Sequence, residues 1–245
     1  MTQSKRIEDF QFKPGKRIGQ NLEIVRRIGY GYESEVYLVR ELPTGFERAA
    51  KFFFPHRNLK NKAAIQYSLK LDKLQEVPMV IRYHSQGKIV FKGQPVTYIV
   101  SEFVRGELLS QFLNRQPGKK LNYFTAIHLL YTLTLGLENI HQRGEYHGDL
   151  HSDNIIVCGF GLHFDIKILD MYYWKSQKKE SRMDDICDMI FIFYEALGGK
   201  KAYSKHPTEI KDICCGLKRS IILKKFKTAG MLKNHLELFR WRAFN

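Results

Sequence analysis

The most informative segment of the sequence is HGDLHSDNIIV, residues 147–157. It brings two carboxylates, two imidazoles and one amide into eight positions directly before an apolar strand. Asp149 can accept a proton from an attacking hydroxyl, and Asn154, five residues later, can offer an oxygen to Mg²⁺. The next short strand, Ile166–Asp170, ends on a carboxylate suited to the same metal. The order of these groups favours a functional loop over a chance polar one.

Upstream of this loop, the pattern predicts an antiparallel sheet with one helix. Residues rich in Val, Ile, Tyr and Phe alternate with turn signals, as is typical of strands. The expected strands are Glu23–Ile28, Ser34–Val39 and Glu47–Phe54, followed by a hairpin of Gly87–Phe91 and Val96–Phe103. Residues 59–75 carry a helical pattern that ends before Val77-Pro78.

Downstream of Glu107 the apolar period becomes helical. We expect a helix over 122–142, capped by Asn122, and a helix over 185–197 that is apolar nearly all round and therefore buried. Two further helices are expected at about 208–219 and 227–240. The sequence thus predicts an α+β fold with an N-terminal extension (1–22), a β lobe (23–104) and a mostly helical lobe (105–245).

Two features of the β lobe suit a phosphate ligand. The segment Gly29-Tyr-Gly31-Tyr-Glu-Ser34-Glu-Val36 lies between two expected strands, and its glycines let backbone N–H groups approach a phosphate. A plain hairpin turn explains the same glycines. Lys51, on an apolar strand, either snorkels outward or faces a cleft to hold a phosphate.

Together these motifs resemble a protein kinase over roughly residues 20–240, in order and spacing. The resemblance implies a two-lobed kinase-like fold that uses ATP and Mg²⁺. It gives Asp149, Lys51 and Asn154 catalytic roles, with Asp149 as base, makes Asn154 and Asp170 the metal ligands, and places Ser101 at the gatekeeper position and Asp185 behind the catalytic loop. The implied nucleotide-binding residues are Ile28, Gly29, Gly31, Ser34, Val36, Ala49, Lys51, Ser101, Glu102, Val104, His151 and Ile156.

The chain departs from the family pattern at three places. No acid lies between Lys51 and Asp72, so the helix Glu that pairs with the strand lysine is missing, and Gln66, Tyr67 or Ser68 stands in its neighbourhood. Gly148 and His151 replace an Arg and a Lys of the usual catalytic loop. For His151, contact with the γ-phosphate and a structural hydrogen bond are both open. The segment after Asp170 is short and lacks Ala-Pro-Glu.

These departures leave three functions open. The first is a Ser/Thr protein kinase that transfers the ATP γ-phosphate to a protein hydroxyl. The second is a small-molecule kinase of the aminoglycoside or choline kinase type, because the His-Gly-Asp-Leu-His loop resembles theirs. The third is an ATP-binding pseudokinase scaffold, because the helix Glu is missing.

The composition indicates the cellular location and the kind of partner to expect. The 245 residues carry a net charge of +15 and four cysteines without metal-ligand spacing. No stretch is apolar enough for a membrane helix and the N-terminus is polar, so we expect a cytoplasmic protein, or one delivered into a host cytoplasm if it is an effector. The excess charge suits a protein substrate that is acidic or docked on a basic helical lobe; nucleic acid is possible but not favoured, since the basic runs largely lack interleaved aromatics. The oligomeric state is not predicted.

Overall fold

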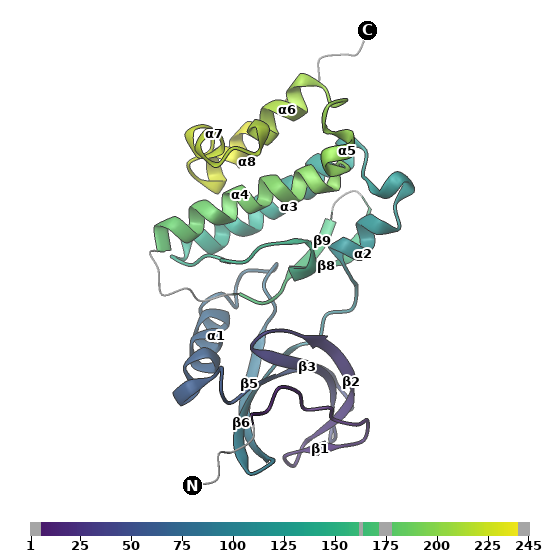
Figure 1. The fold of residues 1–245 in the computed structure, drawn as a ribbon, viewed down its shortest axis with the longest axis vertical. Coiled ribbons are helices and arrows are strands. Elements are labelled where there is room, and N and C mark those ends of the chain that lie inside the picture. Colours follow the sequence, from purple (N-terminus) through teal and green to yellow (C-terminus); the bar gives the residue numbers. More distant parts are fainter. Residues whose placement is uncertain (1–5, 162–163, 172–177, 240–245) are drawn as a thin grey trace. The chain divides into compact units, whose positions relative to one another are not determined.

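The computed structural model describes residues 6–161, 164–171 and 178–239, and the chain forms two compact units (Figure 1). Unit 1 comprises the chain up to Gln75 together with Ile81–Val104. Unit 2 comprises Glu76–Val80 and the chain from Arg105 onward. Each unit has a β-sheet of its own.

Unit 1 is built on a six-stranded antiparallel sheet with the order β1-β2-β3-β4-β6-β5. Its longer strands are rich in β-branched and aromatic residues, which pack well on a pleated surface. The strands are β1 (Arg17–Ile18), β2 (Leu22–Tyr30), β3 (Ser34–Glu41), β4 (Glu47–Phe53), β5 (Tyr83–Phe91) and β6 (Gln94–Glu102).

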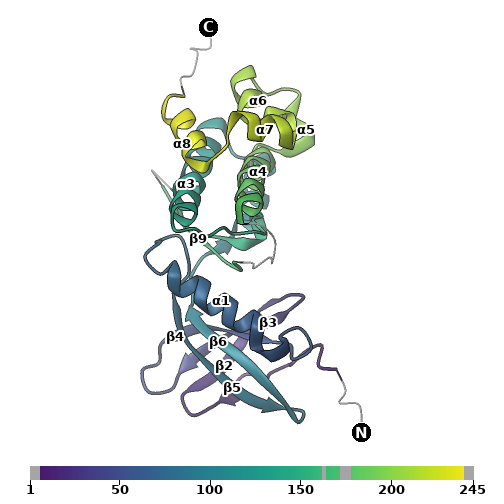
Figure 2. The same ribbon diagram turned by 90° about the vertical axis from the view of Figure 1, so that its left-hand side faces the viewer.

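One α-helix, α1 (Lys62–Lys73), lies against the β5–β6 side of this sheet (Figure 2). A 3-10 turn, η1 (Leu59–Asn61), precedes it. Asn58 Oδ1 accepts a hydrogen bond from the backbone N–H of Ala64 at 3.2 Å, and Asn61 Oδ1 accepts one from the Thr97 hydroxyl of β6 at 2.5 Å. These bonds satisfy a free donor of the first helical turn and tie the start of the helix to the sheet.

The segment before β1 contributes to the core of unit 1. Phe10 and Phe12 are 3% and 6% exposed and belong to the same apolar cluster as Phe52 of β4. The Phe12 and Phe52 rings meet edge to face with centroids 5.0 Å apart, a favourable geometry for aromatic pairs. Residues assigned by sequence to the extension 1–22 therefore complete one face of the sheet.

Unit 2 is mostly helical. Its helices are α2 (Leu109–Asn114), α3 (Tyr123–Gln142), α4 (Lys178–Ala196), α5 (Gly199–Tyr203), α6 (Thr208–Cys214), α7 (Arg219–Lys225) and α8 (Ala229–Glu237), with 3-10 turns η2 (Pro117–Lys119), η3 (Ser152–Asn154) and η4 (Cys215–Leu217). The two long helices, α3 and α4, run side by side in both views, and α8 packs on α3 (Figures 1 and 2). Asn122 caps α3 as predicted, since its Oδ1 accepts from the Thr125 N–H at 2.8 Å.

A small sheet, β7 (Glu107–Leu108), β8 (Ile155–Phe160) and β9 (Phe164–Ile168), completes unit 2. Residues 76–80 belong here because Val80 pairs with Ile168 and the Met79 carbonyl accepts from the Ile168 N–H at 2.7 Å. The Met79 side chain also packs against Gly136 of α3, where an added Cβ would lie 2.1 Å from the Met79 sulfur. Gly136 therefore makes this close approach possible.

The structure confirms an antiparallel β unit with one main helix, followed by a mostly helical unit. Two predicted helix bounds were wrong. The buried helix begins at Lys178 and not at 185, because its first two turns are polar and carry no apolar signal. The helix expected at 208–219 is broken where Cys215, Gly216 and Leu217 adopt φ values of +50°, +60° and +58°. Of the run Met171-Tyr-Tyr-Trp174, which follows Asp170 in the sequence, all residues but Met171 lie outside the described residues.

Candidate active site

The loop between α3 and β8 contains the polar residues 147–154, and a buried carboxylate of α4 fixes its backbone. Asp185 is 0% exposed. Its Oδ2 accepts from the His147 N–H at 2.8 Å and lies 2.9 Å from His141 Nε2, while Oδ1 accepts from the Gly148 N–H at 2.8 Å. Gly148 has a φ of +89°, which a residue with a side chain rarely adopts. The Asp185 carboxylate thus fixes the backbone directly before Asp149, the position behind the loop that the resemblance implies for Asp185.

His147 links this loop to the strand that leads to Asp170. Its Nδ1 accepts from the Asp149 N–H at 3.2 Å, so the ring proton is assigned to Nε2, which donates to the Leu169 carbonyl at 2.7 Å. The imidazole is fully buried. The His147 ring therefore connects the backbone at Asp149 to the backbone at Leu169, directly before Asp170.

Asn154 is oriented by its amide nitrogen. The side-chain Nδ2 donates to the backbone carbonyl of Asp149 at 2.8 Å. The backbone carbonyl of Asn154 accepts from the Leu169 N–H at 2.8 Å. Because the nitrogen is engaged in this way, the side-chain oxygen Oδ1 is the atom that Asn154 can offer to a cation.

Asp170 lies at the same edge of the small sheet as Asn154. Asn154 directly precedes β8 and Asp170 follows β9 by two residues; since the strands are antiparallel, with Ile155 opposite Ile168, the two ends coincide. Asp170 has a φ of +51°, in the left-handed region. Asp residues tolerate this conformation better than most residues, and such positions occur at functional sites.

Asp149 and His151 form the exposed part of the loop. The Asp149 side chain is 53% exposed, and its Oδ2 lies 3.8 Å from His151 Nε2. His151 is also engaged within the loop, because its Nδ1 accepts from the Asp153 N–H at 3.3 Å and Nε2 lies 3.0 Å from Asn154 Nδ2. The structural hydrogen bond considered for His151 is therefore present, and its contact with a phosphate stays a prediction.

A second carboxylate of α4, Asp188, lies behind the same loop and was missed in the sequence. Burial raises its pKa from 3.8 to about 7, with the negative charges of Asp185, Asp184 and Asp149 adding to the shift; the backbone N–H of Leu150 opposes it. Asp188 lies three residues after Asp185, on the same helix face. That spacing was the available signal.

Unit 1 gathers several predicted nucleotide-binding residues on one face of its sheet. Residues directly opposite each other in antiparallel strands share a face. Val36 and Ile99 flank Lys51 in one row, and the next row holds Leu38, Ala49 and Ser101. Since Ala49 and Lys51 are two residues apart, both rows lie on the same face.

The glycine-rich segment forms the hairpin between β2 and β3. The Gly31 N–H donates to the Ser34 carbonyl at 2.9 Å, and Gly29 pairs with Val36. Ile28 is the extra residue of a bulge just before the hairpin, which bends the strand locally. This hairpin turn is compatible with both explanations of the glycines, a phosphate-binding loop and a plain turn.

The remaining predicted residues lie at strand ends or in unit 2. Glu102 ends β6, where its N–H donates to the Arg82 carbonyl at 2.9 Å. Val104 ends unit 1. Ile156 lies on β8 of unit 2, paired with Leu108 and Lys167.

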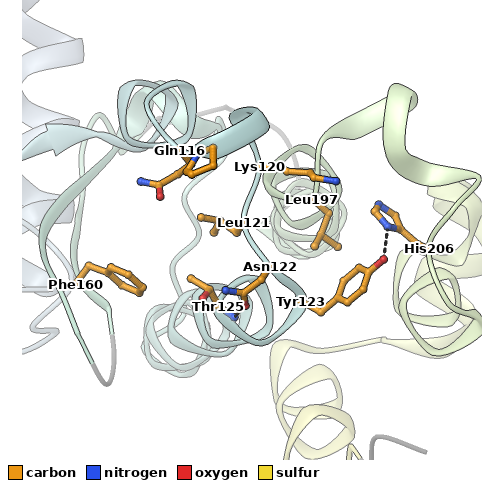
Figure 3. Close-up of a pocket in the computed structure, with 10 residues that line it drawn as sticks. Gln116, Lys120, Leu121, Asn122, Tyr123, Thr125, Phe160, Leu197 and His206 are labelled. Carbon is orange, nitrogen blue, oxygen red and sulfur yellow. Dashed lines mark hydrogen bonds between the residues drawn. The ribbon is translucent and has the colours of Figure 1, made fainter. Parts of the chain in front are cut away.

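A cavity of about 510 Å³ in unit 2 contains none of these residues (Figure 3). Figure 3 shows Tyr123 and His206 meeting at its wall, where His206 Nδ1 lies 3.1 Å from the Tyr123 hydroxyl. Burial lowers the pKa of His206, as do Lys120 and Lys211. The lining residues are Gln116, Pro117, Lys120, Leu121, Asn122, Tyr123, Thr125, Phe160, Leu197 and His206. The cavity is therefore separate from the catalytic loop.

The chain is similar in sequence to serine/threonine-protein kinases. The chain is 23% identical over 235 residues to the "Probable serine/threonine-protein kinase YbdM" of Bacillus subtilis, covering 90% of this chain and 87% of that protein. It is 27% identical over 202 residues to the ovarian-specific serine/threonine-protein kinase Lok of Drosophila melanogaster, covering 78% of this chain but only 41% of the relative.

Solved structures agree in fold. Rad53 in complex with AMP-PNP matches with a TM-score of 0.71 at 19% identity, over 88% of this chain and 64% of that one. The PknI kinase domain of Mycobacterium tuberculosis matches with a TM-score of 0.68 at 15% identity, over 93% and 98%. The family model described as "Protein kinase domain" matches residues 22–210. Because this match covers more than half of the chain, the chain belongs to the protein kinase domain family.

Proposed function

We propose that the protein is a Mg-ATP-dependent serine/threonine kinase that phosphorylates a protein hydroxyl, with Asp149 as the base. The observation that carries the proposal is the half-exposed Asp149 carboxylate on a loop whose backbone is fixed by Asp185, His147 and Asn154. A base must be reachable by its substrate and held still, and both conditions are met here.

Unit 1 would supply the groups that hold the nucleotide. Lys51 and the backbone N–H groups of the Gly29–Ser34 hairpin suit the phosphates. The backbone of Glu102 suits the adenine base of the nucleotide. Val36, Ala49 and Ser101 share the Lys51 face of the sheet and would contact the adenine side. The AMP-PNP complex of Rad53, a structure of similar fold, supports ATP as the nucleotide.

Asn154 and Asp170 fit a magnesium ion. Mg²⁺ takes one or two protein groups and completes its shell with phosphate oxygens and water. The bound ion would neutralise charge on the transferred phosphoryl group. Asn154 Oδ1 and the Asp170 carboxylate, brought to one sheet edge, are the hard oxygen ligands it prefers.

In the reaction the acceptor hydroxyl oxygen bonds to the γ-phosphorus, its proton passes to Asp149, and the bond from the γ-phosphorus to the bridging oxygen breaks so that ADP leaves. The protein does no covalent chemistry of its own. Its contribution is to position the reactants and stabilise the charge.

The test is the intact mass of the purified protein and of a generic acidic protein after incubation with Mg-ATP, compared with Asp149→Asn. We expect phosphate on one or both proteins and none with the variant, because the amide cannot accept the proton. Asp170→Ala serves as a second arm and should lower Mg-dependent ATP affinity.

Other outcomes would separate the alternatives. ATP hydrolysis or transfer to a small hydroxyl compound, without protein phosphorylation, would indicate a small-molecule kinase. ATP binding without transfer to any acceptor, and with equal mass in both proteins, would indicate a pseudokinase and overturn the proposal. The protein-kinase relatives favour phosphorylation of a protein over both of these outcomes.

We propose an acidic protein as substrate and the cytoplasm as location. Within the described residues no helix is long and apolar enough to cross a membrane. The net charge of +15 favours negatively charged partners.

A further inference from the structure

The ammonium group of Lys51 lies over an aromatic ring of α1. Its Nζ is 4.7 Å from the centroid of the Tyr67 ring and 5.9 Å from that of Phe53. Both distances are within the roughly 6 Å over which a ring face attracts a cation. Tyr67 therefore occupies the place on the helix where the sequence lacked an acid.

The packing around Tyr67 fixes this ring. Tyr67 is 8% exposed and meets Phe53 at a centroid distance of 6.3 Å in an edge-on geometry. Phe53 lies two residues after Lys51 on β4, so both point to the same face of the sheet. The hydrogen bond from Thr97 of β6 to Asn61 anchors the start of α1 to that sheet. The ring consequently has a defined position relative to Lys51.

The carboxylate of α1 does not share this face. Asp72 is the acidic residue of the helix, and it is exposed, whereas Tyr67 is buried. Five residues correspond to about 140° around an α-helix, so Asp72 and Tyr67 point in different directions. The group that α1 presents to Lys51 is a ring and not a carboxylate.

We propose that Tyr67 is a positioning residue that orients Lys51 toward the nucleotide phosphates through a cation–π contact, at the place on α1 where the family carries a glutamate. This inference rests on the proposed function. A ring attracts the ammonium without neutralising it, so this contact does not reduce the positive charge that faces the phosphates. The contact needs the face of the ring and not the phenol hydroxyl.

The test compares Tyr67→Phe, which keeps the ring, with Tyr67→Leu, which removes it. Phe12→Leu is a matched control: Phe12 is 6% exposed in the same unit, and Lys16 Nζ lies 4.3 Å from its ring. We expect kcat/KM for ATP to stay within about twofold in Tyr67→Phe and in the control, and to fall about tenfold or more in Tyr67→Leu, a change of about 1.4 kcal/mol per tenfold.

A second arm preserves the volume of the core. Pentafluorophenylalanine incorporated at position 67 keeps the ring but reverses the charge pattern of its face. It should therefore lower kcat/KM for ATP about as much as Tyr67→Leu. Because it preserves the packing, it also tests the inference if the leucine variant does not fold. A readout independent of catalysis is the NMR shift of ¹³C-methylated Lys51, assigned with Lys51→Arg. Ring current should displace it upfield in the wild type and in Tyr67→Phe but not in Tyr67→Leu.

The inference would be overturned by an unchanged kcat/KM in the fluorinated protein, by an equal loss in Phe12→Leu, or by a Lys51 shift that does not change when the ring is removed. A loss in Tyr67→Phe as large as in Tyr67→Leu would assign the role to the hydroxyl and also overturn it. If the wild type transfers no phosphate, the proposed function fails, and the Lys51 shift still decides whether the contact exists.

Discussion

Asp185 and Asp188 lie one turn apart on α4, and each holds a different part of the catalytic loop. Asp185 accepts from the backbone of His147 and Gly148, and Asp188 from the backbone of Leu150. Packing two carboxylates behind one loop places like charges close together. Burial and this repulsion raise the pKa of Asp188 to about 7, which makes the charge on the back of the loop sensitive to pH near neutrality.

The raised pKa of Asp188 predicts a pH-dependent cost in stability. The folded protein holds this proton more tightly than the unfolded chain, so the contribution of Asp188 to stability falls as pH rises from about 4 to about 7, and it stays low above that. Asp188→Asn keeps an acceptor for the Leu150 N–H but removes the charge. We therefore expect the variant to melt at a higher temperature than the wild type at pH 8, with the two nearly equal at pH 4.5.

Asp184→Asn provides the matched control for Asp188→Asn. Asp184 is half-exposed and forms an ion pair with Arg219, an arrangement that contributes at most about 1 kcal/mol. Its removal should change stability little and keep most of the fall in stability between pH 4 and 7, because burial and Asp185, the two largest causes of the raised Asp188 pKa, remain. A lower melting temperature for Asp188→Asn at pH 8 would show that its charge is satisfied and would refute the prediction.

Spacing along the sequence was enough to predict several site residues, but it does not show which face of a helix points to the sheet. Asn154 and Asp170 could be proposed as metal ligands because each adjoins a short strand, and the structure brings them to one sheet edge. Asp185 could be placed behind the loop by resemblance. Tyr67 could be named only as one of three neighbours, because which residue of a helix meets Lys51 depends on how the helix is rotated against the sheet.

At the scale of elements, the N-terminal segment is held to the sheet through two buried polar side chains. The Phe10 N–H donates to Glu35 Oε1 and the Phe12 N–H to the Tyr37 hydroxyl, each at 3.2 Å, while the Tyr37 hydroxyl donates to Glu35 Oε2. Burial and the nearby carboxylate of Glu35 raise the pKa of Tyr37, so the phenol stays protonated and can donate. Both side chains are 0% exposed, so water cannot replace a lost partner.

Removing the Tyr37 hydroxyl is expected to loosen this segment. Tyr37→Phe leaves the Phe12 N–H and one Glu35 oxygen without their partner, which should lower the free energy of unfolding by about 1–3 kcal/mol. Urea unfolding of the full chain measures the change. The matched control is Tyr30→Phe, because Tyr30 is 63% exposed and its hydroxyl lies 3.5 Å from the Glu8 carbonyl, so its loss should be nearly neutral. Equal effects of the two substitutions would show that the segment is not anchored through Tyr37.

Elements with a strong apolar period were predicted well, and those without one were not. Helix α3 and the strands of unit 1 have a clear period and a clear boundary. The start of α4 is polar, and the break at Cys215–Leu217 depends on a left-handed backbone that only Gly216 hints at. The N-terminal segment has no regular period at all, since its Phe residues insert singly into an aromatic cluster.

At the scale of the whole molecule, the charge of +15 is the property most relevant to partners. Unit 2 carries exposed lysines from α5 onward, namely Lys200, Lys201, Lys205, Lys218, Lys224 and Lys227. Other lysines of this region are engaged: Lys225 pairs with Asp212, and Lys211 donates to the Ser204 carbonyl. The exposed group can therefore either attract an acidic partner or remain a solvated basic surface.

Salt dependence distinguishes a docking surface from a solvated one. Exposed charges are screened over about 10 Å at 0.1 M ionic strength and over about 3 Å at 1 M, so KM for an acidic protein substrate should rise several-fold between 50 and 250 mM salt while kcat changes little. Lys200→Gln combined with Lys201→Gln should reproduce part of that rise at low salt. Lys88→Gln combined with Lys92→Gln removes the same charge from exposed positions of unit 1 and should have a smaller effect. If the two double variants behave alike, net charge and not a docking surface attracts the substrate, and if KM does not depend on salt, the lysines of unit 2 are a solvated surface only.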